Sequence, residues 1–244
     1  MKIEQKIHIG TSGWRYEHWR GPFYPEGLST DAMLAYYSRH LQTVEVNRSF
    51  YQLPQKDTFL SWRDTCHPGF NFTIKAHRYI THMKKLKDAT GRLSLFLERI
   101  KVIDYKLGPI LFQLPSRWRF NAHRLNEFLE QLPGDYRYAF EFRDPSWYNS
   151  RTYEALSRYG TAFCIYDLAG HQSPKEITTN FVYVRLYGTE EPYRGKYDDS
   201  ALIDWAGHFY SWAHQGKEIF CYFDNDKAGY AVKNALKLHK IINS

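Results

Sequence analysis

The stretch FEFRDPSW, residues 140–147, alternates aromatic and charged side chains and then stops at a proline. Phe140 and Phe142 share one face of an extended chain and Glu141 and Arg143 the other, because successive side chains of a strand point to opposite sides. One face therefore suits a packed apolar layer. The other presents an acid and a base together, and buried charges need partners. We expect this strand to belong to a fold that gathers charged strand ends at one place.

Strand-like and helix-like segments alternate along the whole 244-residue chain. Short apolar runs predict strands, and segments with a helical period predict the helices between them. The predicted strands are 6–12, 43–50, 70–77, 109–115, 138–143, 162–167, 181–187 and 218–224. The predicted helices are 30–41, 57–66, 92–105, 122–132, 152–159, 200–215 and 229–242. Only the connection AGHQSPKEITTN, residues 169–180, is too broken for a good helix.

About eight β/α units in a chain of this length are typical of a TIM barrel. The sequence therefore predicts an α/β fold with a TIM-like (β/α)8 barrel, and a doubly wound open sheet is the structural alternative. No linker rich in Gly, Ser or Pro divides the chain, and its 43% hydrophobic content suffices for a large core. We expect a single domain over residues 1–244.

Composition also limits the compartment and the partners. The start, MKIEQKIHIG, lacks the apolar region of a signal peptide, and no apolar run approaches the roughly 18 residues of a membrane span. We therefore expect a cytoplasmic protein with no membrane partner. The three cysteines are too scattered for a disulfide framework and are predicted to be reduced. The formal charge of +7 weakly favours anionic partners, so nucleic acid stays open as a partner.

Polar residues at the strand ends are predicted to meet at one mouth of the barrel. Inward and outward residues alternate along each barrel strand, so Glu141 and Arg143 would line that mouth. The same parity on the other strands collects Glu45, Asn47, Lys75, His77, Gln113, Asp167, Arg185, Tyr187, Tyr222 and Asp224. Stability alone would favour branched apolar residues on the axis, so the convergence indicates a site. A one-residue slip at a bulge would exchange Asp224 for Asn225.

The loop GTSGWRYEHWRGPFYP, residues 10–25, follows the first predicted strand. Backbone amides of a Gly-rich turn can receive an anion, and aromatic residues such as Trp14 can stack on a sugar or a base. The alternative is that these aromatics cover the barrel and pack the first helix, which is their commoner fate.

Several motifs together resemble those of the YecE-like family, also called domain of unknown function 72. They are GTSGWRYEHWRGPFYP, VEVNRSFYQLP, FNFTIKAHRYITH, LGPILFQLP, FEFRDPSW, YVRLYG and YFDNDKAGYAVKNA, in this order over nearly the whole chain. The resemblance implies a TIM-like barrel and brings no established reaction. Two positions differ from the family pattern: Tyr187 stands where family members often have His, and Asp224 where Asn is common.

The predicted mouth residues fall into two chemical groups. Lys75, Arg143 and Arg185 together can hold a phosphate or a carboxylate. Glu141, Glu45 and Asp167 are candidates for a general acid or base, provided that burial raises the pKa of one of them. The remaining candidates for ligand binding are Trp14, Asn47, His77, Gln113, Tyr187, Tyr222, Asp224 and Asn225. The alternative is a set of compensating ion pairs that makes a polar barrel interior tolerable.

No cofactor is predicted from the sequence. A dinucleotide fingerprint and a P-loop are both absent, so neither NAD nor ATP is implied. His77 is the one histidine in the predicted mouth, which disfavours a multinuclear zinc centre. A single Mg²⁺ at carboxylates such as Glu45, Glu141 or Asp224 stays open.

Three functions are therefore compatible with the sequence. The first is a cofactor-independent enzyme, of hydrolase or lyase type, that acts on an anionic ligand at the mouth. The second is a nucleic-acid-binding or processing barrel. The third is a partner-binding barrel without chemistry, for which we expect a mouth closed by ion pairs.

Overall fold

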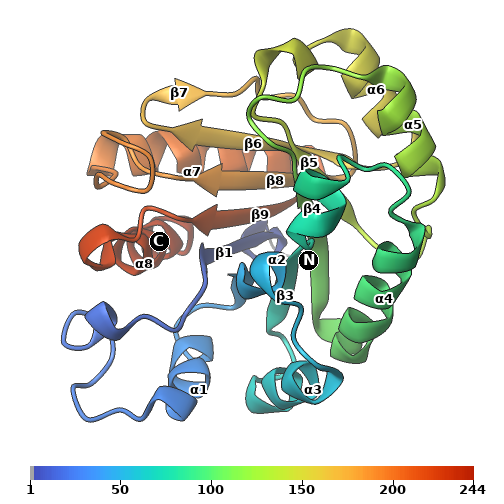
Figure 1. Cartoon of the computed structure of the whole chain (residues 1–244). Helices are drawn as coiled ribbons and strands as arrows, with labels where there is room; N and C mark the ends of the chain where they lie inside the picture. Colours follow the sequence, from blue (N-terminus) through green and yellow to red (C-terminus); the bar gives the residue numbers. More distant parts are fainter. Residues whose placement is uncertain (1–2) are drawn as a thin grey trace.

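Eight parallel strands close into a barrel in the computed structural model, which describes residues 3–244 (Figure 1). The strand order is β5-β4-β3-β2-β1-β9-β8-β6-β7, and an additional pairing of β5 with β6 closes the ring. β7 is a two-residue strand that pairs antiparallel with β6 outside the ring. The predicted TIM-like barrel is thus confirmed, and the open-sheet alternative is wrong.

The observed strands lie close to the predicted ones. They are β1 (Ile7–Ser12), β2 (Thr43–Val46), β3 (Asn71–Lys75), β4 (Leu107–Gln113), β5 (Tyr138–Glu141), β6 (Ala162–Leu168), β7 (His171–Gln172), β8 (Phe181–Leu186) and β9 (Glu218–Phe223). The largest difference is at β2, predicted to extend to residue 50. It ends at Val46, because Asn47 already has helical torsion angles and begins the short helix α2.

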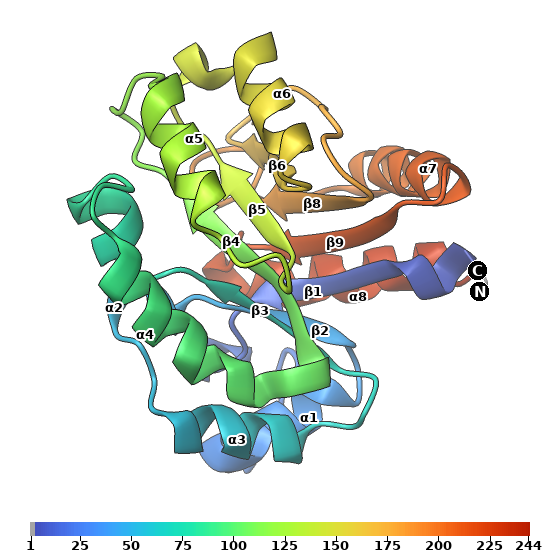
Figure 2. The same cartoon turned by 90° about the vertical axis from the view of Figure 1, so that its right-hand side faces the viewer.

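Helices surround the strands on the outside, with α4, α5 and α6 on one side, α7 and α8 on the other, and α1 and α3 below in Figure 2. They are α1 (Met33–Ser38), α2 (Arg48–Tyr51), α3 (Lys56–Thr65), α4 (Thr90–Ile100), α5 (Ala122–Glu130), α6 (Ser150–Arg158), α7 (Asp199–His214) and α8 (Tyr230–Ile242). Short 3-10 turns and one π-helical turn, Tyr79–Met83, join them. Asn121, Asn149 and Asp198 start α5, α6 and α7, since each side chain accepts a backbone N–H of the first turn.

The sixth β/α unit has no helix, as predicted from AGHQSPKEITTN. After β6 the chain turns back as β7, and Ser173 then fixes the return because its N–H donates to Tyr166 O at 2.9 Å. Residues 173–180 run without a helix to β8. The outer layer is therefore interrupted between α6 and α7.

Two apolar cores lie on the two sides of the strands. Phe140 and Phe142 point outward, and Phe142 stacks on Trp147 with ring centroids 4.7 Å apart. The separate inner core consists of Leu111, Ala139, Ala162, Cys164, Phe181, Tyr183, Phe220 and Tyr222. The alternation in FEFRDPSW is therefore the alternation between outer core and barrel interior. The inner core seals the barrel below the strand ends that form the mouth.

Candidate active site at the barrel mouth

Arg185 lies at the centre of the mouth and binds three carboxylates. Its Nη2 is 2.6 Å from Glu45 Oε1 and 3.0 Å from Asp224 Oδ2, and its Nη1 is 2.9 Å from Glu141 Oε2. The three acids come from β2, β5 and the end of β9, which the barrel brings to one level. Arg185 has an exposed fraction of 0%, as do Glu45 and Glu141. We name Arg185, Glu45, Glu141 and Asp224 the charge cluster.

Glu141 is the most fully bound carboxylate of the charge cluster. It accepts hydrogen bonds from Arg143 Nε, from Gln113 Nε2 at 2.9 Å and from Tyr187 OH at 2.8 Å, besides its bond to Arg185. Burial by itself would raise the pKa of Glu141, but the charges of Arg143 and Arg185 outweigh burial and hold this pKa below its ordinary value. Glu141 is therefore ionised at neutral pH and acts as the counter-ion of two arginines.

Glu45 is held by hydroxyl groups on its other side. Tyr183 OH donates to Glu45 Oε2 at 2.6 Å, and Ser12 Oγ donates to Oε1. Ser12 Oγ in turn accepts from Asn47 Nδ2. Tyr222 lies one layer deeper, with its hydroxyl 2.8 Å from Thr43 Oγ1 and 2.7 Å from Thr73 Oγ1. This hydrogen bonding makes Tyr222 part of the support beneath the charge cluster.

Lys75 stands at the end of β3 without a carboxylate partner. No ion pair within residues 3–244 includes it, and its Nζ lies over the ring of Phe50, 4.5 Å from the centroid. The side chain is 8% exposed. Burial, followed by the charge of Arg185, lowers the pKa of Lys75 to about 8. An ammonium group in this state exchanges protons near neutral pH.

The pKa of Asp224 is shifted in the opposite direction to that of Lys75. Burial raises its pKa to about 7, although Arg185 and Lys75 act against the rise. Its side chain is 14% exposed, so it is more accessible than Glu45 and Glu141. Asp224 and Lys75 therefore form a pair of groups whose protonation changes in the same pH range.

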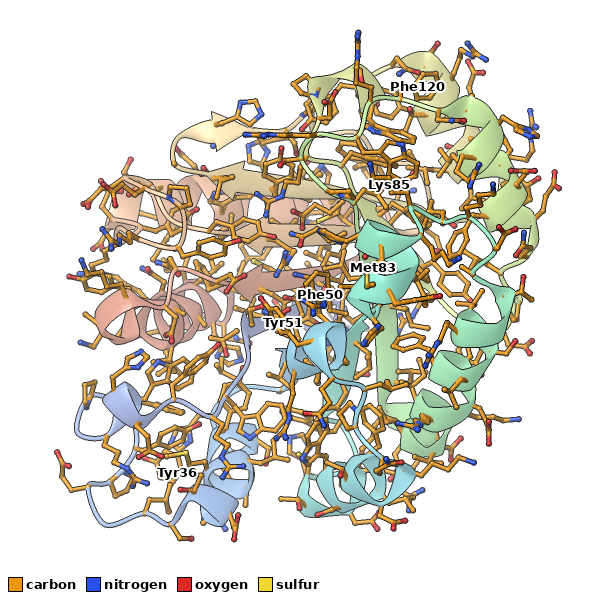
Figure 3. All side chains as sticks on the ribbon, in the orientation of Figure 1. Tyr36, Phe50, Tyr51, Met83, Lys85 and Phe120 are labelled. Carbon is orange, nitrogen blue, oxygen red and sulfur yellow. The ribbon has the colours of Figure 1, made fainter. Side chains whose placement is uncertain are left out.

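Aromatic residues form the upper wall of the mouth. The Arg143 guanidinium lies 4.3 Å from the ring centroid of Tyr187 and 4.9 Å from that of Tyr166. Its Nη2 is buried and finds no acceptor among the described residues. On the other side, Figure 3 shows Phe50, Tyr51 and Met83 close together, where α2 meets the π-helical turn. The ring of Phe50 is 5.0 Å from that of His82.

Two of the predicted mouth residues point elsewhere. Asp167 faces outward, because the inner parity of β6 belongs to the small residues Ala162 and Cys164. It lines a cavity of about 740 Å³ beside α7, and burial raises its pKa. Asn225 donates to Gly195 O at 2.9 Å and to Asn234 Oδ1 at 3.0 Å, so it fixes the loop before α7. Asp224, not Asn225, is therefore the residue that enters the mouth.

His77 and Trp14 lie outside the charge cluster, and among residues 3–244 no hydrogen bond or ion pair joins the side chain of either to it. His77 Nδ1 accepts the N–H of Tyr79 at 3.1 Å and so begins the π-helical turn. Trp14 points toward Trp62 of α3, with ring centroids 5.0 Å apart, in a cleft of about 440 Å³ that Asn47 also lines. Gln113, Arg143 and Tyr187 lie in the mouth as expected from their parity.

Sequence reasoning missed several residues of the mouth, namely Ser12, Phe50, His82, Tyr166 and Tyr183. Ser12 and Tyr183 have the inward parity of β1 and β8, so the alternation that selected Arg185 would have found them. Phe50 and His82 come from segments after the strands, and no strand pattern reaches them.

The side chains and helices of the described residues were compared with what a metal site and a membrane span require. In the part of the chain that the structure describes, no three His, Cys, Asp or Glu side chains are arranged to hold a metal ion. Arg185 occupies the centre of the acidic groups. No described helix combines the length and apolar character that crossing a membrane requires.

The closed barrel and the polar strand ends define a (β/α)8-barrel protein with one mouth. The chain belongs to the family described as protein of unknown function DUF72, whose model matches residues 8–244. It is 25% identical over 272 residues to the UPF0759 protein YunF of Bacillus subtilis (strain 168), covering 97% of this chain and 95% of that protein. It is 30% identical over 145 residues to the UPF0759 protein YecE of Escherichia coli (strain K12); that match covers 58% of this chain and only 50% of the relative's length.

Solved structures of the family share the fold. A DUF72 family protein of Thermotoga maritima MSB8 has a TM-score of 0.88 and 29% identity, with 98% of this chain and 99% of that chain covered. A DUF72 family protein of Enterococcus faecalis V583 has a TM-score of 0.84 at 20% identity, with coverage of 98% and 96%. The predicted family membership is therefore confirmed.

Proposed function

We propose that this barrel is a cofactor-independent enzyme that acts on a small anionic ligand at its mouth. The observation that carries the proposal is Lys75, a buried ammonium group without a carboxylate partner among residues 3–244. A barrel interior built only for stability would pair each buried charge, because an unpaired one is strongly unfavourable. An unpaired cation beside Asp224, whose pKa is near neutrality, is the arrangement that a functional site needs.

The roles follow from the contacts. In the mouth, Lys75 Nζ and Arg143 Nη2, like Nε of the fully buried Arg185, find no acceptor oxygen among the described residues. Lys75 and Arg143 therefore receive the phosphate or carboxylate of the ligand. Asp224 is the proton-transfer group, because a pKa of about 7 lets it both give and take a proton at neutral pH. Glu141 and Glu45 keep Arg185 in place as counter-ions. A proton-transfer group beside a fixed cation suits a hydrolysis or a lyase-type elimination.

One observation favours the competing function of a partner-binding barrel without chemistry. Lys75, Arg143 and Arg185 face Glu45, Glu141 and Asp224, so three positive and three negative charges balance when all are ionised. A balanced cluster with buried centre matches the expectation for a mouth closed by ion pairs. The two functions differ in what Lys75 does, because only the enzyme needs it.

The test is thermal unfolding with phosphate, short carboxylates and single-stranded oligonucleotides, for the wild type, Lys75→Ala and Lys233→Ala. Lys233 is exposed on α8, so its variant loses the same charge from the surface and not from the mouth. We expect a small anion to raise the Tm of the wild type and of Lys233→Ala and to leave that of Lys75→Ala unchanged, since ligands stabilise the state that binds them. If no anion shifts the wild type and Lys75→Ala is the more stable protein, the cluster is structural. Stabilisation by oligonucleotides alone, fading with salt, would instead favour nucleic-acid binding.

A further inference from the structure

We infer that the cleft between Trp14 and Trp62 binds a phosphorylated ring compound, at a site separate from the charge cluster. The cleft measures about 440 Å³, which is within the range of small-molecule sites. It lies between the loop after β1, the first turn of α2 and helix α3. We name it the indole cleft. The inference does not depend on the proposed enzyme activity.

The walls of the indole cleft are aromatic. Trp14 and Trp62 are both partly exposed and meet edge to face, with ring centroids 5.0 Å apart and an interplanar angle of 88°. Phe59 fixes Trp62 from behind, at 5.3 Å and 89°. A rigid indole face exposed in a concave site offers a stacking surface for a flat ring or for the apolar face of a sugar.

Two arginines at the rim give the cleft a positive charge. Arg15 and Arg48 are exposed, and no ion pair within residues 3–244 includes either side chain. The neighbouring Arg63, by contrast, pairs with Asp64 at 2.7 Å. Guanidinium groups bind phosphate through two parallel hydrogen bonds, so two unpaired arginines at one rim suit a phosphate group.

Hydrogen-bonding groups line the space between the walls and the rim. The lining includes the hydroxyl-bearing residues Thr30, Thr58 and Ser61 and the carboxylate of Asp31. The hydroxyls of Tyr16 and Thr65, which also line the cleft, already donate to Ser12 O and Ser61 O. Asn47 Oδ1 is buried and finds no donor among the described residues, so a ligand hydroxyl reaching it would satisfy it. A row of hydroxyl and amide groups beside an aromatic wall matches the hydroxyl-rich ring of a sugar phosphate or the ribose of a mononucleotide.

Asn47 connects the indole cleft to the charge cluster. Its Nδ2 donates to Ser12 Oγ, which lies 3.3 Å from Arg185 Nη2 and bonds Glu45. A ligand that orders Asn47 therefore acts on a group two hydrogen bonds from the centre of the mouth.

The test is calorimetric titration of the whole chain with ribose 5-phosphate, adenosine monophosphate, adenosine and inorganic phosphate. The variants are Arg48→Ala, Trp62→Ala and the control Arg158→Ala, which removes another exposed arginine, on α6. We expect a phosphorylated ring compound to bind the wild type and Arg158→Ala alike. Binding to Arg48→Ala should be about tenfold weaker or more, as for loss of one charge-assisted hydrogen bond.

The choice of ligands distinguishes a sugar phosphate from a mononucleotide as the natural ligand of the cleft. Equal binding of ribose 5-phosphate and the nucleotide identifies a sugar phosphate, and binding of the nucleotide alone identifies a mononucleotide. Absence of binding, binding of phosphate as tight as that of either ring compound, or full binding by Arg48→Ala would overturn the inference. The Arg48 side chain is exposed and makes no hydrogen bond or ion pair among residues 3–244, so Arg48→Ala should fold normally and keeps the test valid if Trp62→Ala is unstable. Lys75→Ala should still bind here even if the mouth binds nothing.

Discussion

Arg185 is the residue on which the mouth depends most, because it offsets three buried carboxylates at once. Replacing it by methionine, of similar length, leaves Glu45 and Glu141 buried without this counter-ion. We expect Arg185→Met to lower the free energy of unfolding by about 3–5 kcal/mol, as is typical when one partner of a buried pair is removed. Urea denaturation measures the loss. Arg194→Ala, which breaks an exposed pair with Glu191, should lose less than about 1 kcal/mol; equal losses would contradict a central role for Arg185.

Asp224 should make stability depend on pH in a direction opposite to that of an ordinary ion-paired acid. Its pKa is about 7 in the folded protein and about 3.8 for an ordinary aspartate, as in the unfolded chain, so between these values the folded state binds the extra proton. Stability from this group is therefore fully present below about pH 4 and is lost as the pH rises to 7. Asp224→Asn, which cannot ionise, should become progressively more stable than the wild type over this window. A constant difference from pH 4 to 8 in urea denaturation would show that Asp224 is not buried as described.

The residues of the mouth could be predicted from strand parity where each strand carried a clear alternation. Glu141, Arg143 and Arg185 follow this rule. Asp167 did not, because Ala162 and Cys164 face the narrow axis, which leaves Asp167 on the outward parity of β6. The small side chains of Ala162 and Cys164 in the first half of β6 were the signal that distinguishes the two parities. Nothing in the sequence indicated that Lys75 lacks a partner, since that depends on distances between strands.

At the scale of elements, close approach of β1 and β2 depends on Gly10. A Cβ at Gly10 would lie 2.1 Å from Thr43 O, a backbone atom that cannot move without displacing β2. We expect Gly10→Ala to destabilise the fold by about 1–3 kcal/mol through overpacking. Gly207, inside α7, has no atom within 4 Å of a built Cβ, so Gly207→Ala should stabilise by about 0.5–1 kcal/mol. Thermal unfolding of both variants gives the comparison, and a tolerated Gly10→Ala would mean that the two strands can separate freely.

The elements themselves were largely predictable, because each strand and each long helix carries its own period. The exceptions lie where the chain changes direction at the mouth. The strand predicted for 43–50 contains the start of α2, and apolar Phe50 belongs to the wall beside Lys75 and not to the sheet. The local sequence pattern cannot distinguish Phe50 from a strand residue. An apolar residue that packs over a buried cation and an apolar residue inside a strand look the same in the sequence.

At the scale of the whole molecule, the barrel has one weak seam. β5 and β6 pair over only two residue pairs, Ala139 with Ala162 and Phe140 with Phe163, whereas β1 and β9 pair over five. The sixth unit also lacks a covering helix, and the 740 Å³ cavity beside α7 lies where the outer layer is interrupted. Backbone hydrogen bonds open locally at a lower free-energy cost where few residues pack around them and unfilled space lies nearby than they do in a packed core.

This seam predicts the order of amide hydrogen exchange around the barrel. Amides of residues 162–163 and of the connection 169–180 should exchange faster than those of β1 and β9, because opening β5 from β6 disturbs the fewest strand pairs. Exchange measured by mass spectrometry on peptides of the intact chain tests this. Uniform protection around the ring would mean that the barrel opens only by global unfolding. Opening at the seam would instead leave β2, β3, β8 and β9 paired, so Lys75, Arg185 and Asp224 would keep their positions while the wall at Arg143 and Tyr166 moves.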